Sequence, residues 1–449
     1  MTEKPKTCSL LTLGCKVNQY ESQYFREMLE LNGIHIVEED ESTDLCIINT
    51  CTVTHDADAK GRNIIRKIQS RNPKSIILVT GCYAEREPET LRKIPGVAKV
   101  IGNKEEFLDS LLEFGIEQRP KHITRFDEHQ RAFVKVQDGC LLNCSYCIIP
   151  SVRPNLRSRH PQDILDEIEQ LEQNGYQEVV LNGIHLGHYG IDLSKGKPKA
   201  EWNRLWHLLG DISRRFPSMR IRLSSLEAAE ARDDLIKVIR DHPRVAAHFH
   251  LCLQSGSDKI LAAMRRRYTA QGFRERVHRI REALDTPGFS TDIIVGFPGE
   301  TEEDFEQTCQ ISREAGFFKM HVFPYSPREG TPAANIRETV SHQEKSTRRQ
   351  ILEMIESENR GRFQANLQGK QEEVLVESAS FKPGFVEGTS SRGIRISLPG
   401  MLDALRRKLV PVIVKGIEKE TLLGQPIPVE TVVETQHAKP SSRISLQIV

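Results

Sequence analysis

The sequence contains no long hydrophobic run and no excess of charge of either sign. No stretch approaches the ~18 apolar residues of a transmembrane helix, and the N-terminal MTEKPKTCSLL has no apolar segment of signal-peptide length. We therefore expect a cytoplasmic protein with no membrane partner. Because 63 Lys and Arg residues balance 62 Asp and Glu residues, any affinity for nucleic acid must come from local basic patches. A chain of 449 residues has room for roughly two to four domains.

Cysteine is also scarce, with ten residues in the chain, yet Cys140, Cys144 and Cys147 lie within eight residues in DGCLLNCSYCIIP. In a reducing compartment, clustered cysteines are typical of metal sites or catalysis. A structural zinc site needs four ligands, and the nearest histidine, His160, lies thirteen residues beyond Cys147. Electron-transfer clusters usually have four cysteine ligands. Three thiolates on a four-iron cluster leave one iron open, so the spacing favours a reactive cluster over packing, zinc or electron transfer.

The first region, residues 1–120, alternates short apolar runs with helical segments, and a polar linker follows at residues 120–133. This alternation is typical of a wound parallel α/β domain. We expect strands at Ser9–Leu13, Leu45–Ile48 and Ile76–Val79, and helices at Glu21–Leu31, Asp56–Arg71 and Glu89–Ile94.

The second and third regions differ from the first and from each other. Residues 133–365 contain six strand-like segments with helical spacers, which predict a partial (β/α)6 barrel: FVKVQ, EVVLNG, MRIRLSS, HFHLCLQ, STDIIVGFPG and KMHVFPYS. A charged helical stretch covers residues 340–368. From residue 368 to 435 apolar and polar residues alternate between turns, which predicts a small β-barrel. The fold class is therefore α/β with a terminal all-β module.

Three further cysteines, Cys15, Cys51 and Cys82, each lie just past the end of one of the first three predicted strands. The carboxyl ends of parallel strands share one edge of a sheet, where ligands commonly bind. We therefore expect these cysteines to meet in space and to form a second three-cysteine site. Cys46 and Cys252 lie inside apolar strands and are interpreted as core residues.

The segment CLLNCSYC, with Tyr146 before its last cysteine, resembles the signature of radical S-adenosylmethionine (radical SAM) enzymes. The resemblance implies that Cys140, Cys144 and Cys147 hold a [4Fe-4S] cluster whose open iron chelates S-adenosyl-L-methionine, and that Tyr146 contacts its adenine. One-electron reduction then cleaves the cofactor to a 5'-deoxyadenosyl radical. Because barrel sites form at the carboxyl ends of strands, we predict further cofactor contacts there, at Asn182, Gly183, Ser225, Glu227 and Gly296.

Two three-cysteine sites followed by a β-module resemble the methylthiotransferases across nearly the whole chain. The stretches GCKVNQYES and NTCTVTHDADAK are most similar to the tRNA branch that converts N6-threonylcarbamoyladenosine at position 37, in the anticodon loop, to its 2-methylthio form. The resemblance implies a second [4Fe-4S] cluster on Cys15, Cys51 and Cys82 that carries the sulfur, so that all six cysteines serve catalysis. It also implies a TRAM-like RNA-binding barrel at residues 368–435 and an electron donor such as flavodoxin or ferredoxin.

Two alternatives stay open at this point. A methylthiotransferase acting on isopentenyladenosine 37 of tRNA, or on a ribosomal protein, would share both clusters and the chemistry. A non-catalytic iron-sulfur protein that binds RNA or transfers electrons would share the cysteines but would not cleave S-adenosylmethionine.

Basic residues near the cysteine segments support an RNA partner. The helix expected after Cys51 has a run of basic residues without an acidic one, and two further runs follow: Lys60, Arg62, Arg66, Lys67, Arg71 and Lys74; Arg153, Arg157 and Arg159; Arg265–Arg267. Two features depart from the family. Arg153 is followed by Pro154 where the family commonly has glycine, and Phe385 is the only aromatic residue of GFVEGTSSRGIRI, so we expect the barrel to grip backbone more than bases.

Overall fold

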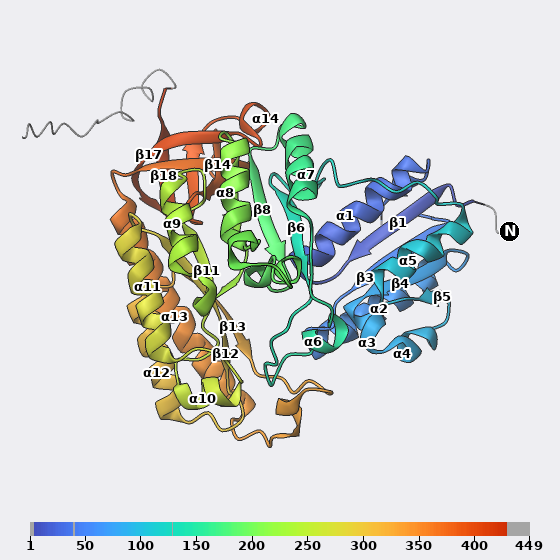
Figure 1. The fold of residues 1–449 in the computed structure, drawn as a ribbon, viewed down its shortest axis with the longest axis horizontal. Helices are drawn as coiled ribbons and strands as arrows, with labels where there is room; N and C mark the ends of the chain where they lie inside the picture. The colour runs from blue at the N-terminus through green and yellow to red at the C-terminus, as the bar shows by residue number, and fades with distance from the viewer. Residues whose placement is uncertain (1–3, 39–40, 128, 429–449) are drawn as a thin grey trace, which may run out of the picture.

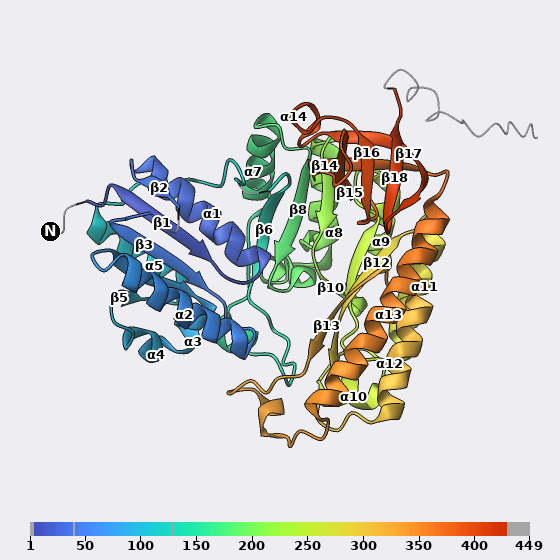
Figure 2. The same cartoon turned by 180° about the vertical axis from the view of Figure 1, so that it is seen from behind.

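The computed structural model describes residues 4–38, 41–127 and 129–428. Figures 1 and 2 show an N-terminal sheet domain beside a central curved sheet, with helices along the outer side of that sheet and a small barrel at one end. The α/β class and the terminal barrel expected from the sequence are both confirmed. Residues 429–435, which we assigned to the barrel, lie outside the described residues.

The N-terminal domain is a five-stranded parallel sheet in the order β2-β1-β3-β4-β5. Every residue of its central strand β3 is buried, as in a sheet covered on both faces. The edge strands β2 and β5 are too short to give a periodic signal in the sequence. The strands are β1 (Thr7–Thr12), β2 (His35–Val37), β3 (Leu45–Thr50), β4 (Ile76–Gly81) and β5 (Val97–Val100), and the helices are α1 (Lys16–Leu31), α2 (His55–Arg71), α3 (Cys82–Arg86), α4 (Pro88–Arg92) and α5 (Lys104–Ser110).

The six strand segments of the second region all form strands of a partial barrel. One part has the order β7-β6-β8-β9 and the other β10-β11-β12-β13, and an Ile221–Val245 bridge joins them. The strands are β6 (Ala132–Asp138), β7 (Arg157–Ser158), β8 (Glu178–Gly183), β9 (Arg220–Leu223), β10 (Leu226–Glu227), β11 (His248–Cys252), β12 (Gly288–Val295) and β13 (Lys319–Pro324). The helices are α6 (Ile149–Val152), α7 (Pro161–Gln173), α8 (Leu205–Arg215), α9 (Asp233–Asp241), α10 (Asp258–Ala263), α11 (Ala270–Ala283) and α12 (Glu302–Ala315).

The two faces of this sheet differ in chemistry. Alternate residues of a strand point to opposite faces, and the outward set, such as Phe249, Ile293 and Met320, packs in one apolar core with the surrounding helices. The opposite set on the same strands is polar and includes His250 and Asp292. We call this second surface the inner face, because it lines the inside of the partial barrel.

The charged stretch expected at residues 340–368 forms helix α13 (His342–Leu367), which packs against β13 and α12. A capping box at Ser341 and Glu344 fixes its start. α13 is 26 residues long but carries charged residues throughout. In the part of the chain that the structure describes, no helix combines the length and the apolar character needed to cross a membrane.

The C-terminal module is a closed barrel in the order β14-β15-β16-β18-β17. It docks onto the amino-terminal ends of the central strands, where the buried Arg220 donates to the carbonyls of Glu373 and Thr389 and Arg222 to that of Ser390. Its elements are β14 (Gln371–Ala379), β15 (Phe385–Ser390), β16 (Arg395–Pro399), α14 (Leu402–Leu405), β17 (Leu409–Glu418) and β18 (Thr421–Pro426). The barrel therefore covers the end of the sheet opposite to its carboxyl edge.

Candidate active site

The loop after β6 carries Cys140, Cys144 and Cys147 at the carboxyl edge of the central sheet. It starts at Gly139, where φ is +78° and an added Cβ would lie 2.1 Å from the carbonyl oxygen of Asn155. Cys144 is buried and the other two cysteines are half-buried. Burial raises the pKa of Cys144 and of Cys147, and repulsion from Cys140 adds to each rise, which indicates that the three thiols lie close together.

Arg266 links this loop to the rest of the site. Its Nη1 donates to Cys144 Sγ at 3.1 Å and to Tyr146 Oη at 3.4 Å, and its Nη2 pairs with Glu227 at the end of β10. The side chain is only 3% exposed. The interpretation that grouped Arg265–Arg267 as an RNA-binding run is therefore wrong for Arg266, whose guanidinium faces the cysteine loop.

The thiols of the loop are poorly suited to act as free nucleophiles. Burial raises the pKa of Cys147 to about 12, and burial also raises that of Cys144 although Arg266 opposes the rise. A thiol with a high pKa is protonated at neutral pH and unreactive, whereas a bound metal ion deprotonates a coordinating thiol. The chemistry of this donor set therefore fits an iron-sulfur cluster.

Among the other predicted cofactor contacts, Asn182 at the end of β8 has a distinctive environment. Both polar atoms of its side-chain amide are buried and have no hydrogen-bond partner within the described residues. Buried amides are normally satisfied, so this side chain fits a site for a polar ligand. Gly183 follows Asn182, and the side chain of Gln137 packs closely against it, because a Cβ added at Gly183 would lie 2.8 Å from Gln137 Oε1.

The environments of Ser225 and Gly296 give less support for a contact with the cofactor. Ser225 is exposed at the break between β9 and β10. Gly296 has a φ of +73°, its N–H donates to Glu300, and an added Cβ would lie 2.4 Å from Lys345 Cγ. Packing against α13 thus accounts for this glycine, and its contact with the cofactor stays a prediction.

A polar cluster beside Cys140 has no counterpart in the sequence interpretation. His185 Nδ1 lies 3.6 Å from Cys140 Sγ, the His185 ring stacks on His188 with centroids 3.7 Å apart, and Glu230 pairs with His185. Burial lowers the pKa of His188 to about 4. The ligand atoms of the two histidines and Glu230 lie within 4.8 Å of one another, a spacing that could hold a metal ion. This cluster could not be predicted from the sequence, because two histidines in a loop have no periodic pattern and Glu230 follows a different strand.

The second three-cysteine set comes together at the carboxyl edge of the N-terminal sheet. Cys15, Cys51 and Cys82 follow β1, β3 and β4, which are neighbours in that sheet. Gly14 packs against Cys51 so closely that an added Cβ would lie 2.9 Å from its Sγ. Burial raises the pKa of Cys51 to about 11, and Cys82 and Cys15 add to the rise. Cysteines far apart in the sequence thus share one electrostatic environment, as the strand ends predict.

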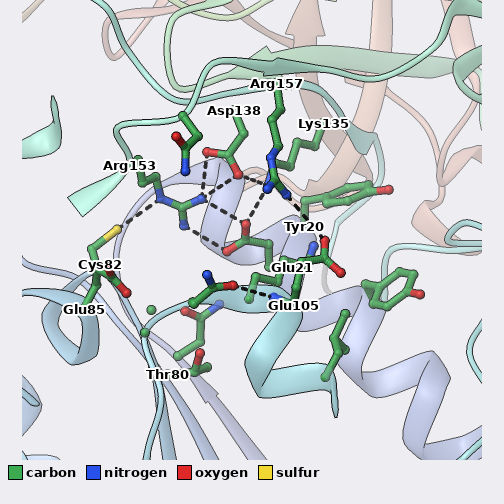
Figure 3. Close-up of a pocket in the computed structure, with 18 of the residues that line it drawn as sticks. Tyr20, Glu21, Thr80, Cys82, Glu85, Glu105, Lys135, Asp138, Arg153 and Arg157 are labelled. Atoms are coloured by element: carbon green, nitrogen blue, oxygen red, sulfur yellow. Dashed lines mark hydrogen bonds and ion pairs between the residues drawn. The ribbon is translucent and has the colours of Figure 1, made fainter. Parts of the chain in front are cut away.

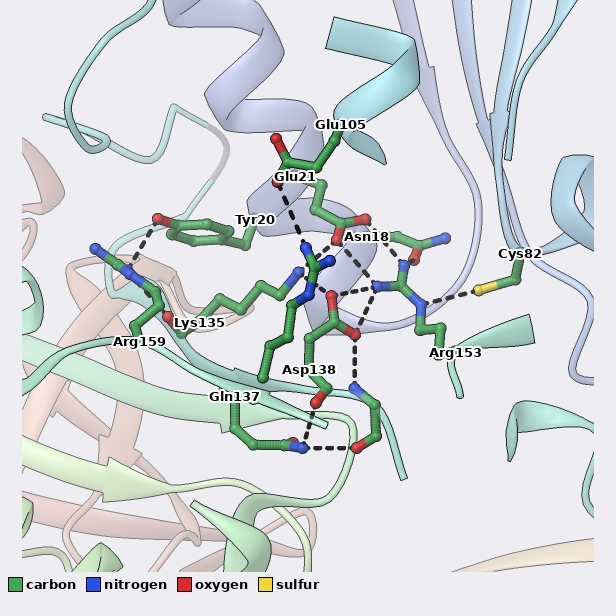
Figure 4. Close-up of polar contacts among 12 residues, drawn as sticks. Asn18, Tyr20, Glu21, Cys82, Glu105, Lys135, Gln137, Asp138, Arg153 and Arg159 are labelled. Atoms are coloured by element: carbon green, nitrogen blue, oxygen red, sulfur yellow. Dashed lines mark hydrogen bonds and ion pairs between the residues drawn. The ribbon is translucent and has the colours of Figure 1, made fainter. Parts of the chain in front are cut away.

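Arg153 connects the two cysteine sets, and Figure 4 shows its contacts with Cys82, Glu21 and Asp138. Its backbone carbonyl accepts the N–H of Cys140 at 3.3 Å, and its Nε donates to Cys82 Sγ at 3.3 Å. The guanidinium also binds the carboxylates of Glu21 and Asp138 at 2.9–3.0 Å. One buried residue therefore contacts a member of each set. This contradicts the interpretation of Arg153 as part of an RNA-binding run.

A cavity of about 530 Å³ lies beside this network, between the N-terminal domain and β6 (Figure 3). Glu21, Cys82, Lys135 and Arg153 line it. Lys104 is also on its wall, and burial, with repulsion from Lys135, lowers the pKa of Lys104 to about 8. Cys82 thus borders a polar chamber.

The basic stretch after Cys51 forms the exposed side of α2. The isoleucines pack inward as expected, and Arg62 donates to Tyr83 Oη at 2.6 Å. Arg159 pairs with the buried Glu167, whereas Arg157 is 66% exposed. The basic residues of this segment with exposed positions are Lys60, Arg66, Lys67, Arg71 and Lys74. Of the basic residues predicted to face RNA, these five, which lie on or just after α2, and Arg157 are exposed, and Arg265 and Arg267 are exposed as well.

Two sequence models of protein families match the chain. That of the Radical SAM superfamily matches residues 134–311, and one described as Uncharacterized protein family UPF0004 matches residues 7–102. The solved structure of the radical S-adenosylmethionine methyltransferase TsrM from Kitasatospora setae, with cobalamin and a [4Fe-4S] cluster bound, has a TM-score of 0.54 at 14% identity, covering 73% of this chain and 77% of TsrM. The fold and the cysteine loop define a radical SAM enzyme, with an iron-sulfur cluster and S-adenosylmethionine as its cofactors.

Similar proteins of known function identify the family to which the chain belongs. "Threonylcarbamoyladenosine tRNA methylthiotransferase MtaB" of Bacillus subtilis is 36% identical, with 83% of this chain and 85% of the relative covered. "tRNA-2-methylthio-N(6)-dimethylallyladenosine synthase" of Carboxydothermus hydrogenoformans is also 36% identical, covering 84% and 89%. MtaB proteins of four other bacteria are 34–37% identical. The chain belongs to the MtaB family of methylthiotransferases.

Proposed function

We propose that this protein methylthiolates N6-threonylcarbamoyladenosine at position 37 of tRNA, at C2 of the base, by radical SAM chemistry. The observation that carries the proposal is the contact of Arg153 with both cysteine sets, through Cys140 N–H and Cys82 Sγ. Insertion of sulfur at a carbon radical requires the sulfur to be held next to the site where the radical is made. A plain radical SAM enzyme has no need of a second three-cysteine site at that place.

The six cysteines would each have a defined part. Cys140, Cys144 and Cys147 would hold the cluster that, when bound, supplies the electron for cleavage of S-adenosylmethionine. Asn182 would hydrogen-bond the cofactor with its unpaired amide, and Tyr146, Gly183, Ser225, Glu227 and Gly296 would complete the contacts. Cys15, Cys51 and Cys82 would hold a second [4Fe-4S] cluster that positions the sulfur. A flavodoxin or ferredoxin would act as electron donor.

The tRNA would lie across the exposed side of α2 and reach the C-terminal barrel. Lysine and arginine side chains on α2 would bind backbone phosphates, and binding would weaken as salt rises. The anticodon loop is single-stranded, so base 37 can leave its stack and enter the site between the two sheets. The barrel, which resembles a TRAM module, would add backbone contacts.

The test is mass spectrometry of tRNA nucleosides from cells with and without the gene, followed by the reaction of the purified, anaerobically reconstituted protein with each candidate RNA. We expect 2-methylthio-N6-threonylcarbamoyladenosine to disappear on deletion and to return with the gene. Loss of the 2-methylthio dimethylallyl nucleoside instead would assign the protein to the function of the Carboxydothermus relative. Unchanged tRNA together with loss of a ribosomal-protein methylthio group would reject the tRNA function.

A further inference from the structure

The inner face of the partial barrel carries a row of polar side chains that the reaction chemistry above does not use. The strand register aligns His250 of β11 with Ser290 of β12 and Lys319 of β13. Ser290 Oγ lies 2.9 Å from His250 Nδ1 and 2.9 Å from His248 Nε2. Lys319 therefore stands on a polar surface built by three neighbouring strands.

Two lysines, Lys16 and Lys319, lie on this surface. Within residues 4–38, 41–127 and 129–428, neither Lys16 nor Lys319 forms an ion pair. Lys16, the first residue of α1, reaches toward the barrel and places its Nζ 5.9 Å from the centroid of the Phe133 ring on β6. Lys319 is exposed, and Lys16 is exposed over part of its side chain although its ammonium group is closely surrounded, so a ligand that enters the partial barrel can reach both.

The carboxylate on the next row, Asp292, is engaged by histidines and forms no ion pair with Lys16 or Lys319. Asp292 accepts from His321 at 3.1 Å and pairs with His250 at 3.2 Å, and these histidines lower its pKa. Burial lowers the pKa of Lys16 and the pKa of His248. Nearby cations, which for both groups include Arg222 and Lys319, lower them further, and Asp292 opposes only part of the fall at Lys16. The surface around Lys16 and Lys319 is therefore positively charged and would be stabilised by an anion.

The substituent on the proposed substrate supplies such an anion. A threonylcarbamoyl group ends in the free carboxylate of threonine, whereas a dimethylallyl group is apolar and has no charge. We infer that Lys319 and Lys16 bind the carboxylate of the threonylcarbamoyl group and thereby select this base over adenosines with an apolar group on N6. The inference rests on the proposed function and names the residues that set its substrate choice.

The test compares two anticodon stem-loop RNAs that differ only at the carboxyl group, one with N6-threonylcarbamoyladenosine and one with its uncharged methyl ester. Kd is measured by fluorescence anisotropy on the full-length, reconstituted protein. Because a charge-assisted hydrogen bond contributes more than a neutral one, we expect the wild type to bind the acid on the order of 10- to 100-fold more tightly than the ester. Lys319→Met and Lys16→Met should each reduce this ratio, and Lys319→Arg should restore most of it.

Lys237→Met, on the outer helix α9, is the matched control and should keep the wild-type ratio. Equal affinity of the wild type for acid and ester would overturn the inference. Equal weakening of both RNAs by Lys319→Met would also overturn it, because that result assigns the lysine to a backbone phosphate. These experiments measure binding alone. Failure of the proposed function would give a different result, namely the absence of methylthiolation by a wild type that still binds the RNA.

Discussion

Replacing Arg153 with Met should destabilise the junction between the N-terminal domain and the central sheet. The guanidinium makes six hydrogen bonds, to Cys82, Glu21, Asp138 and Asn18, and its side chain is 11% exposed. Removing it leaves the carboxylates of Glu21 and Asp138 with Lys135 as their ion-pair partner and Lys104 as a further nearby cation. Breaking a buried ion pair from one side costs about 3–5 kcal/mol, and we expect a loss of this size in the free energy of unfolding.

The loss should depend on pH in a defined direction. Burial alone would raise the pKa of both carboxyl groups, but Arg153 and Lys135 hold the pKa of Glu21 well below its ordinary value and that of Asp138 at about 2. Groups with a lowered folded pKa stabilise the fold above their unfolded pKa and lose that contribution as pH falls through the folded value. The wild type should therefore keep this stabilisation down to about pH 4, near the unfolded pKa of a carboxyl group. Without Arg153 the carboxyl groups become easier to protonate, so less of the stabilisation is present at neutral pH.

The assay is urea unfolding followed by circular dichroism between pH 4 and pH 8. Arg157→Met is the matched control, because Arg157 lies four residues away, is 66% exposed and meets Glu105 only at 3.9 Å, a pair worth about 0–1 kcal/mol. The double variant Glu21→Gln with Arg153→Met should recover part of the loss, since it removes one of the unpaired charges. Equal unfolding midpoints for the Arg153 and Arg157 variants would refute the reasoning.

Three further predictions concern the clusters and the RNA surface. If both cysteine sets hold four irons, the reconstituted protein should contain about eight irons and the Cys140→Ala, Cys144→Ala, Cys147→Ala variant about four, as counted by metal analysis; zinc in place of iron would reject the assignment. Cys51→Ala should still produce 5'-deoxyadenosine but no methylthiolated base, and product formed at the parental rate would show that the second site does not hold the sulfur. Lys60→Gln and Arg66→Gln should each lower the slope of log K against log salt for tRNA by about 1, whereas Lys237→Gln should leave it unchanged.

The fold and the two cysteine sets could be predicted because their signals are local or follow from strand ends. The fully buried run of β3 is visible in the sequence, and so is the spacing of Cys140, Cys144 and Cys147. Cys15 could be grouped with distant cysteines because parallel strands end at one edge. In each case a pattern of a few residues was enough.

The roles of the arginines could not be predicted in this way. Arg153 and Arg266 lie in basic runs, which are usually solvated surfaces, but their partners Glu21 and Glu227 come from distant parts of the chain. A run of basic residues in the sequence does not indicate which of its side chains is buried. Cys252 shows the same limit: it is buried, as expected of an apolar strand, but alternation places it on the inner face, 3.9 Å from Asp292.

The docking of the C-terminal barrel determines how its role can be studied. Arg220 is 1% exposed, and the carbonyls of Glu373 and Thr389 complete its hydrogen bonds, with Glu178 as its ion-pair partner. Deleting the barrel would expose this arginine and remove those acceptors, and β9 pairs with β8, the strand that carries Asn182 near its end. A truncated protein would therefore lose support for the pair of strands that carries Asn182 at its opposite end, and weakened activity would not separate RNA binding from catalysis. Substitution of exposed barrel lysines leaves these contacts in place, so it tests the RNA role of the barrel without disturbing the sheet beneath it.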